Sequence, residues 1–221
     1  MIERTSIKPE DLWYTIGLIT TDGNLSPDHR HINITSKDTA LLESVRHALG
    51  LTNKITRKAN GYSSARIYGA LQFGDVKLYR YLESIGLSQR KSLTLEAIAI
   101  DEQYFPDFLR GVIDGDGCIR HWRHPSNGNE QWEMRVYSAA PIFSHWLHEK
   151  ITQYFKVKGV VLSSSARRKN TIYALKFGKM AAQKILSKCY YQDALSLRRK
   201  HILAQECVAA TDGWKKSVTV L

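Results

Sequence analysis

The sequence has few of the features that mark secreted or membrane proteins. Its three cysteines, Cys118, Cys189 and Cys207, form an odd, widely spaced set without metal-ligand spacing. No apolar run reaches the roughly 18 residues that a membrane-spanning helix needs, and the N-terminal residues lack the cationic start and apolar stretch of a signal peptide. We therefore expect an intracellular, soluble protein with reduced thiols.

Acidic residues are also in deficit, with 21 Asp and Glu against 32 Lys and Arg and a net charge of +11. The excess is uneven, because residues 1–104 hold 13 basic and 12 acidic groups, whereas residues 105–221 hold 19 and 9. A solvated basic surface is one explanation of this charge. A polyanionic partner, nucleic acid in particular, is the explanation that it favours.

The sequence repeats itself. An apolar segment ends in Asp-Gly twice, as TIGLITTDG at 15–23 and as LRGVIDGDG at 109–117. Each copy is followed by a strand-like alternation, an amphipathic helix, two more strand-like stretches, a helix and a basic cluster. The matching pieces are INITS (32–36) and MRVYS (134–138), ALQFG (70–74) and ALKFG (174–178), and SQRKS (88–92) and LRRKH (197–201). This ordered recurrence indicates an internal duplication.

Each half therefore predicts helix, two strands, helix, two strands and helix, written αββαββα. Short polar connections between sequential strands favour antiparallel hairpins, so the expected fold class is α+β. We place the N-terminal half at residues 1–96, a linker at 97–106, the C-terminal half at 107–206 and a tail at 207–221. Trp122, Trp132 and Trp146 are interpreted as packing residues.

Two glycines stand inside the helices that end in Asp-Gly. Gly17 and Gly111 are 94 positions apart, as are Asp22 and Asp116. A glycine in a helix interior costs about 1 kcal/mol relative to alanine. Its recurrence at one helical position indicates that the two helices pack backbone to backbone, which brings Asp22 and Asp116 together at their C-terminal ends.

Two carboxylates at adjoining helix C-termini repel each other and the negative helix ends. A divalent cation between them removes both problems, and Mg²⁺ suits carboxylate and carbonyl oxygens while it keeps several waters. Two acids, a metal ion and a basic protein together favour phosphodiester hydrolysis. A turn is the alternative role of each Asp-Gly pair.

With these motifs the sequence resembles the LAGLIDADG homing endonucleases of the monomeric, two-motif type. LRGVIDGDG is a close match, and TIGLITTDG keeps the glycine at the third position, the aspartate at the eighth and the final glycine. The resemblance covers roughly residues 10–205. It implies two pseudo-twofold-related αββαββα halves, with the motif helices at the interface and two antiparallel sheets forming a saddle over DNA.

The resemblance also implies a metal site. Asp22 and Asp116 are expected to be the metal-binding catalytic carboxylates, and the backbone carbonyls of Thr21 and Gly115 to be further ligands. Mg²⁺ is the expected cofactor, Mn²⁺ is expected to substitute for it, and Ca²⁺ to support binding without cleavage.

Lysines near the scissile phosphates are a further implication of the resemblance. Lys91 and Lys200 match these lysines best. Arg90 and Arg199 are the alternatives if the register shifts by one residue.

Strand alternation predicts which side chains face DNA. If Leu71, Phe73, Leu175 and Phe177 face the core, their neighbours lie on the open face, Glu133 among them. A two-stranded ribbon fits the major groove, where Arg, Lys, Asn and Gln read base edges. The candidate DNA-binding residues are Asn33, Thr35, Arg57, Lys58, Arg66, Tyr68, Gln72, Arg120, Arg123, Arg135, Tyr137, Arg167, Arg168, Lys169 and Lys176. Six of them are expected at the tips of the hairpins, namely Arg57, Lys58, Arg123, Arg167, Arg168 and Lys169. The charge asymmetry predicts that the second half supplies most of the salt-dependent affinity.

The function that the resemblance implies is site-specific, intron-encoded double-strand DNA cleavage with a divalent metal, at a long pseudo-palindromic target. The expected partner is double-stranded DNA, bound by a monomer, and no membrane is involved. Two alternatives on the same scaffold stay open, an intron RNA maturase, for which RNA is the partner, and a non-cleaving DNA-binding protein.

Overall fold

The computed structural model describes residues 7–60, 63–165 and 170–210. The first half runs through α1 (Pro9–Asp22), β1 (Gly23–Leu25), β2 (His31–Ser36), α2 (Thr39–Ala48), β3 (Ile55–Asn60), β4 (Ser63–Gly74) and α3 (Val76–Ser84). The second half runs through the short η2 (Glu102–Tyr104), α4 (Phe105–Asp116), β5 (Gly117–Arg123), β6 (Glu130–Ser138), α5 (Pro141–Phe155), β7 (Val160–Ser164), β8 (Ile172–Gly178), α6 (Lys179–Cys189) and α7 (Arg198–Ala209). The αββαββα order is therefore present in both halves.

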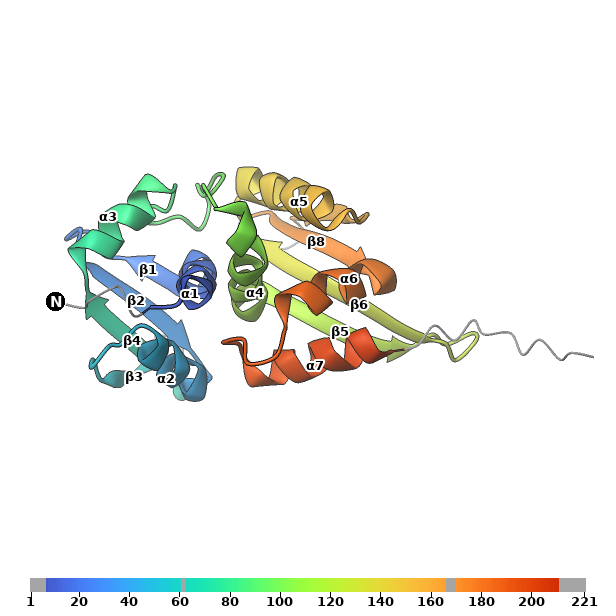
Figure 1. The fold of residues 1–221 in the computed structure, drawn as a ribbon, viewed down its shortest axis with the longest axis horizontal. Coiled ribbons are helices and arrows are strands. Elements are labelled where there is room, and N and C mark those ends of the chain that lie inside the picture. The colour runs from blue at the N-terminus through green and yellow to red at the C-terminus, as the bar shows by residue number, and fades with distance from the viewer. Residues whose placement is uncertain (1–6, 61–62, 166–169, 211–221) are drawn as a thin grey trace, which may run out of the picture.

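Two four-stranded antiparallel sheets lie on either side of the paired helices α1 and α4 (Figure 1). The strand orders are β1-β2-β4-β3 and β5-β6-β8-β7, so the two sheets have the same topology. The α+β prediction and the two-halved arrangement are confirmed. Within the described ranges, no helix combines the length and the apolar character that crossing a bilayer would require.

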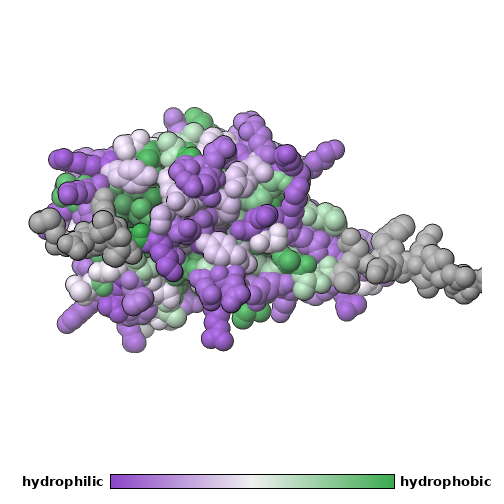
Figure 2. Space-filling model, viewed as in Figure 1, coloured by the Kyte–Doolittle hydropathy of each residue, from purple (hydrophilic) through white to green (hydrophobic). Residues whose placement is uncertain are grey.

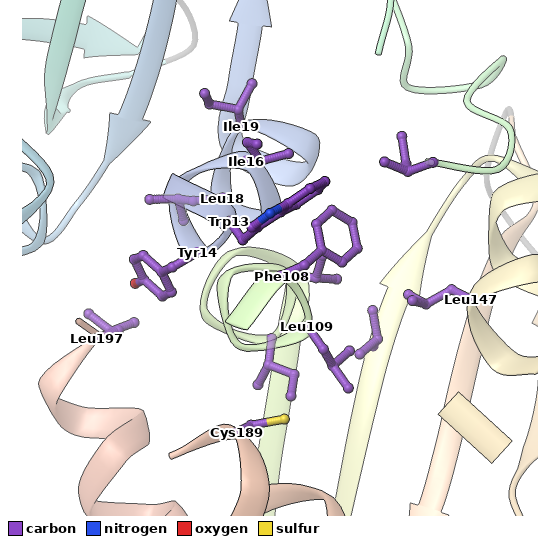
Figure 3. Close-up of a cluster of buried hydrophobic side chains, with 14 of the residues drawn as sticks. Trp13, Tyr14, Ile16, Leu18, Ile19, Phe108, Leu109, Leu147, Cys189 and Leu197 are labelled. Atoms are coloured by element: carbon purple, nitrogen blue, oxygen red, sulfur yellow. The ribbon is translucent and has the colours of Figure 1, made fainter. Parts of the chain in front are cut away.

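The hydrophobic core continues across both halves through α1 and α4. Figure 3 shows Ile16 and Leu18 around α1, Phe108 and Leu109 around the adjoining α4, and Leu147 of α5 beyond them. All five side chains are fully buried. Hydrophilic residues cover most of the face seen in Figure 2, and apolar residues reach it only in small patches.

The tryptophans divide between packing and exposure. Trp132 is buried on the helix-covered face of its sheet, and Trp146 packs against Phe108 and Phe143. Trp122 is 38% exposed, and alternation along β5 places it with Arg120 on the opposite, open face. The packing interpretation is therefore wrong for Trp122.

The basic cluster of the second half begins a helix that the repeat does not predict. Arg198 starts α7, which continues to Ala209 and has no counterpart in the described part of the first half. In the first half the matching cluster lies in turns, and Arg90 has a positive φ of 54°. The eleven residues after Ala210 lie outside the described chain.

Candidate active site

The helices α1 and α4 cross where each has its glycine. A Cβ on Gly17 would lie 2.1 Å from the carbonyl oxygen of Phe108, and a Cβ on Gly111 would lie 2.1 Å from that of Tyr14. Real side chains cannot approach backbone so closely, so only glycine permits this helix spacing at both positions. The close crossing brings the C-terminal ends of the two helices side by side.

Asp22 and Asp116 are the last residues of these helices. Burial raises the pKa of Asp22 to about 6, and the nearby charge of Asp116 adds to the rise. Burial also raises the pKa of Asp116, while Lys200 and Lys91 oppose that shift. Both carboxyls are therefore crowded together at the negative ends of two helix dipoles, as the sequence predicted.

The neighbours of the two aspartates also face each other. A Cβ on Gly115 would lie 1.9 Å from the Thr21 hydroxyl oxygen and 3.4 Å from Asp22 Oδ2. The side chain of Thr21 therefore fills the space that glycine leaves open on the opposite helix. The first motif carries threonine where the second carries glycine, and this exchange lets the unequal helix ends fit together.

A buried lysine from each half reaches a helix end. Lys91 donates to the carbonyl of Gly23, just after α1. Lys200 donates to the carbonyls of Ile113, Asp114 and Gly117, at 2.6, 2.8 and 2.8 Å. Burial lowers the pKa of both lysines to about 8, and the charges of nearby aspartates oppose the shift.

The arginines beside these lysines are exposed. Arg90 and Arg199 lie at the surface, whereas Lys91 and Lys200 are 7% and 3% exposed. The register that assigns the site to the lysines therefore agrees with the geometry.

A cavity of about 260 Å³ opens beside the helix ends. Its lining combines Thr21 and Lys91 of the first half with Asp116, Tyr137 and Ser138 of the second. An acid of one half thus shares a cavity with the lysine of the other half. A site of this kind needs both halves to be complete.

The donor set fits a hard divalent cation. Within the described ranges, no group of three or more His, Cys, Asp or Glu side chains could hold a metal ion. The paired helix ends instead offer two carboxylates, and carbonyls in a last helical turn, such as those of Thr21 and Gly115, receive no bond from a following turn. Mg²⁺ typically uses one or two carboxylates and keeps several waters, whereas structural Zn²⁺ needs four protein ligands.

Asp114 is a buried acid that the sequence reasoning missed. Its carboxylate accepts hydrogen bonds from the hydroxyls of Tyr14 and Tyr190 and from the N–H of Leu197, at 2.9, 2.7 and 2.6 Å. Thr20 holds the matching position in the first motif and only bonds a carbonyl of its own helix. The replacement of a threonine by an acid in the second copy was the available signal.

Arg110 is a second buried group without a counterpart in the first half. It is fully buried and donates to Asp107 at 2.8 Å, and to the carbonyls of Cys189 and Leu195 at 2.7 and 2.9 Å. Its guanidinium also lies 5.0 Å from the ring of Tyr191. Arg110 therefore fixes the segment between α6 and α7, and this segment leads directly into α7, the helix that carries Lys200.

Most predicted DNA-binding residues lie on the open faces of the sheets. The cross-strand pairs Asn33–Gln72 and Arg135–Lys176 have the same place in the two sheets, as their register shows. Alternation along the strands adds the residues Thr35, Tyr68, Arg120 and Tyr137 to these faces. Thr35 also donates weakly to the carbonyl of Asp22, at 3.4 Å.

Arg57 and Arg123 are on the other face. Arg57 pairs with Gly69, whose missing Cβ points at Leu42 and Thr39 of α2, so alternation puts Arg57 on the helix-covered face. Arg123 shares its face with Ile119, which is buried in the core. Their predicted place at hairpin tips is therefore wrong, because both residues belong to strands and their side chains lie on the helix-covered face.

The structure leaves some predicted DNA contacts undescribed. Lys58 and Arg66 are placed only as positions on β3 and β4. Arg167, Arg168 and Lys169 lie outside the described residues.

These two repeats, joined at the helix ends that carry the acids, define a duplicated α+β protein with a single composite site. A family model described as a LAGLIDADG-like domain matches residues 9–86, which contain all elements from α1 to α3. Residues 9–86 therefore form a LAGLIDADG-like domain, and the resemblance to this family is confirmed. A search of curated proteins finds no significant match.

Solved structures share the whole two-halved fold. The meganuclease I-SmaMI, bound to uncleavable DNA, is 14% identical with a TM-score of 0.60, over 89% of this chain and 88% of that one. The homing endonuclease I-WcaI, bound to its DNA recognition sequence, is 10% identical with a TM-score of 0.60, over 86% and 85%. The N-terminal LAGLIDADG domain of DUF199/WhiA is 14% identical with a TM-score of 0.54, over 87% and 86%. At these identities the likeness shows the fold alone.

Proposed function

We propose that the protein is a site-specific, divalent-metal-dependent DNA endonuclease that makes a staggered double-strand cut in a long, pseudo-palindromic target. The observation that carries this proposal is the pair of adjoining helix ends that carry Asp22 and Asp116, close enough for the two carboxyls and for Lys91 and Lys200 to affect one another's charge. Two similar structures are described as bound to DNA, which supports double-stranded DNA as the partner.

Asp22 and Asp116 hold the metal in this proposal, with the carbonyls of Thr21 and Gly115 as further ligands. Mg²⁺ supplies activation of a water and neutralisation of the leaving oxygen when it is bound. The raised pKa of Asp22 supports this assignment, because a nearby cation relieves the repulsion that contributes to the rise. Mn²⁺ is expected to substitute, and Ca²⁺ to support binding without cleavage.

The two lysines supply positive charge to the phosphates. Each keeps its ammonium group buried against carbonyl oxygens at a helix end, so its position is set before DNA arrives. A preorganised charge of this kind stabilises the negative charge that develops on a phosphate in the transition state. A pKa of about 8 leaves both groups mostly protonated at neutral pH.

Two motif helices in one chain complete the site, so we propose that the protein acts as a monomer and is intron-encoded like the family it resembles. Its two halves differ in sequence, which suits an imperfect palindrome. The WhiA structure is described as a LAGLIDADG domain and not as a nuclease. The fold alone therefore leaves a non-cleaving DNA-binding protein or an RNA maturase as the outcomes to be tested.

The test is selection from a randomised double-stranded DNA library, with cleaved molecules recovered in Mg²⁺ and bound molecules recovered in Ca²⁺. We expect both selections to enrich the same long sequence. Enrichment in Ca²⁺ without cleavage in Mg²⁺ or Mn²⁺ would contradict the nuclease and support a DNA-binding protein. Enrichment of no DNA, with tight binding of structured RNA, would support the maturase.

A further inference from the structure

A buried glutamate lies among three cations on the open face of the second sheet. Glu133 is 2% exposed, although alternation along β6 turns it away from the core residues Trp132 and Met134. Arg120 Nη1 donates to Glu133 Oε1 at 3.0 Å, and Lys176 Nζ lies 3.4 Å from Oε2. The basic side chains therefore cover the acid rather than the reverse.

Arg135 completes the group. Its Nε lies 2.7 Å from Glu133 Oε1, but the N–H is not aimed at that oxygen, so the contact is a charge attraction and not a hydrogen bond. The side chains of Arg120, Lys176 and Arg135 remain 51%, 39% and 22% exposed. A ligand that approaches this face meets the three cations before it meets the glutamate.

Neighbouring groups restrict Arg120 further. Its guanidinium lies 5.7 Å from the ring of Trp122, which is on the same face of β5. Arg120 is thus held between the carboxylate of Glu133 and the face of an indole. Long side chains held in this way lose less conformational entropy when they bind than free ones do.

The first sheet has a different arrangement at the matching places. Asn33 and Gln72 stand where the second sheet has Arg135 and Lys176. His31 stands in the place of Glu133, and its Nδ1 lies 2.5 Å from Asp28 of the adjoining turn. The first sheet thus presents amides at these places and the second presents cations ordered by an acid.

We propose that Glu133 is a positioning residue that holds Arg120, Arg135 and Lys176 for base readout, so that the half-site bound by the second sheet requires guanine beneath them. This inference rests on the proposed binding of double-stranded DNA, but not on cleavage. Arg and Lys recognise the O6 and N7 acceptors of guanine, whereas Asn and Gln recognise adenine. The half-site bound by the first sheet accordingly has adenine beneath Asn33 and Gln72.

Glu133 favours contacts of the three cations with bases over contacts with phosphates. Its charge cancels part of the attraction between the cations and the DNA backbone, which carries no sequence information. Removal of that charge frees the cations to reach phosphates. The affinity for DNA of unrelated sequence should then stay the same or rise. The slope of log affinity against log salt concentration should steepen by about one released counterion per protein.

The test compares Glu133→Gln with the wild-type protein in the full chain, by binding selection in Ca²⁺ and by affinity for single base-pair changes. Glu130→Gln is the matched control, because Glu130 lies on the same strand but pairs with His121 on the other face. We expect the wild type and Glu130→Gln to prefer guanine at these positions by about tenfold or more. We expect Glu133→Gln to lose most of that preference, with undiminished affinity for unrelated DNA.

A second variant keeps the inference testable if Glu133→Gln does not fold. Arg135→Lys keeps the charge but loses the planar fork that binds guanine most strongly. We expect it to weaken the guanine preference severalfold with an unchanged salt dependence. An unchanged guanine preference in Glu133→Gln, or in Arg135→Lys where only that variant folds, would overturn the inference. A wild-type protein that enriches no DNA would overturn the proposed function as well, and binding without cleavage would overturn the nuclease alone.

Discussion

The hydroxyl of Tyr14 on α1 donates to Asp114 Oδ2 on α4 at 2.9 Å, so a buried hydrogen bond joins the two halves beside the paired acids. The same oxygen accepts the N–H of Leu197, the residue that precedes α7. Asp114 thus connects α1, α4 and α7, the helix that carries Lys200. The composite site depends on this carboxylate although it does not contain it.

Replacement of Asp114 by alanine leaves three buried donors without an acceptor. We expect Asp114→Ala to lower the free energy of unfolding by about 3–5 kcal/mol, measured by urea denaturation. Thr20→Ala is the matched control at the same motif position, and we expect it to cost under about 1 kcal/mol, since its hydroxyl only bonds its own helix. Equal losses for the two variants would contradict the structural role of Asp114.

The helix crossing predicts a steric effect at both glycines. A methyl group at Gly17 or Gly111 would meet a backbone carbonyl at 2.1 Å, and backbone cannot rotate away as a side chain can. We expect Gly17→Ala and Gly111→Ala each to cost about 3 kcal/mol or more in urea denaturation. Gly178→Ala serves as the control, because a Cβ there meets nothing within 4 Å, and a similar loss in that variant would count against the crossing.

Replacement of Lys91 and Lys200 should affect the stability of the protein to different extents and its cleavage activity to the same extent. Lys200→Met leaves three carbonyls without their donor, whereas Lys91→Met leaves one, so Lys200→Met should be the more destabilising. Both variants should lower the cleavage rate by about 10²–10³, because each removes a preorganised positive charge. Cleavage at the wild-type rate by folded Lys91→Met or Lys200→Met would show that the replaced lysine has no part in catalysis.

Asp22 predicts a pH dependence of stability in the metal-free protein. Its folded pKa of about 6 lies above its ordinary value of 3.8. Between these values the folded protein keeps a proton that the unfolded chain has released, so stability falls as the pH rises through this range. Asp22→Asn lacks the ionisable group and should not lose this stability. After allowance for solvent screening, its free energy of unfolding relative to that of the wild type should rise by about 1–2 kcal/mol from pH 4 to 7.

Magnesium should reverse this difference. At pH 7, added Mg²⁺ should raise the melting temperature of the wild type and leave that of Asp22→Asn nearly unchanged, because only the wild type keeps both carboxylates. A constant difference between the two proteins across pH and Mg²⁺ would show that Asp22 has an ordinary pKa and no metal.

Local patterns were enough to predict the duplicated fold and the close crossing of the two motif helices. Gly17 and Asp22 recur at the same spacing as Gly111 and Asp116, and a helix is regular enough for that spacing to predict which residues meet. The placement of Arg57 and Arg123 at hairpin tips was wrong because it depends on where a strand ends, which periodicity places poorly. Once β3 continues to Asn60, Arg57 lies within the strand and alternation decides its direction.

The buried polar groups could not be predicted in the same way. The partners of Asp114 come from residues 14, 190 and 197, which only the folded chain brings together. Glu133 was expected on the open face, and it lies there. Its burial follows from the three long side chains that close over it, and their arrangement depends on the cross-strand register of β5, β6 and β8.

The most direct test of the account is cleavage of the selected DNA target in Mg²⁺ by the wild type, Asp22→Asn and Asp116→Asn, with binding measured in parallel in Ca²⁺. We predict double-strand cleavage by the wild type, none by either variant, and DNA binding by all three. Full double-strand cleavage by either variant would contradict a site shared between the two helix ends.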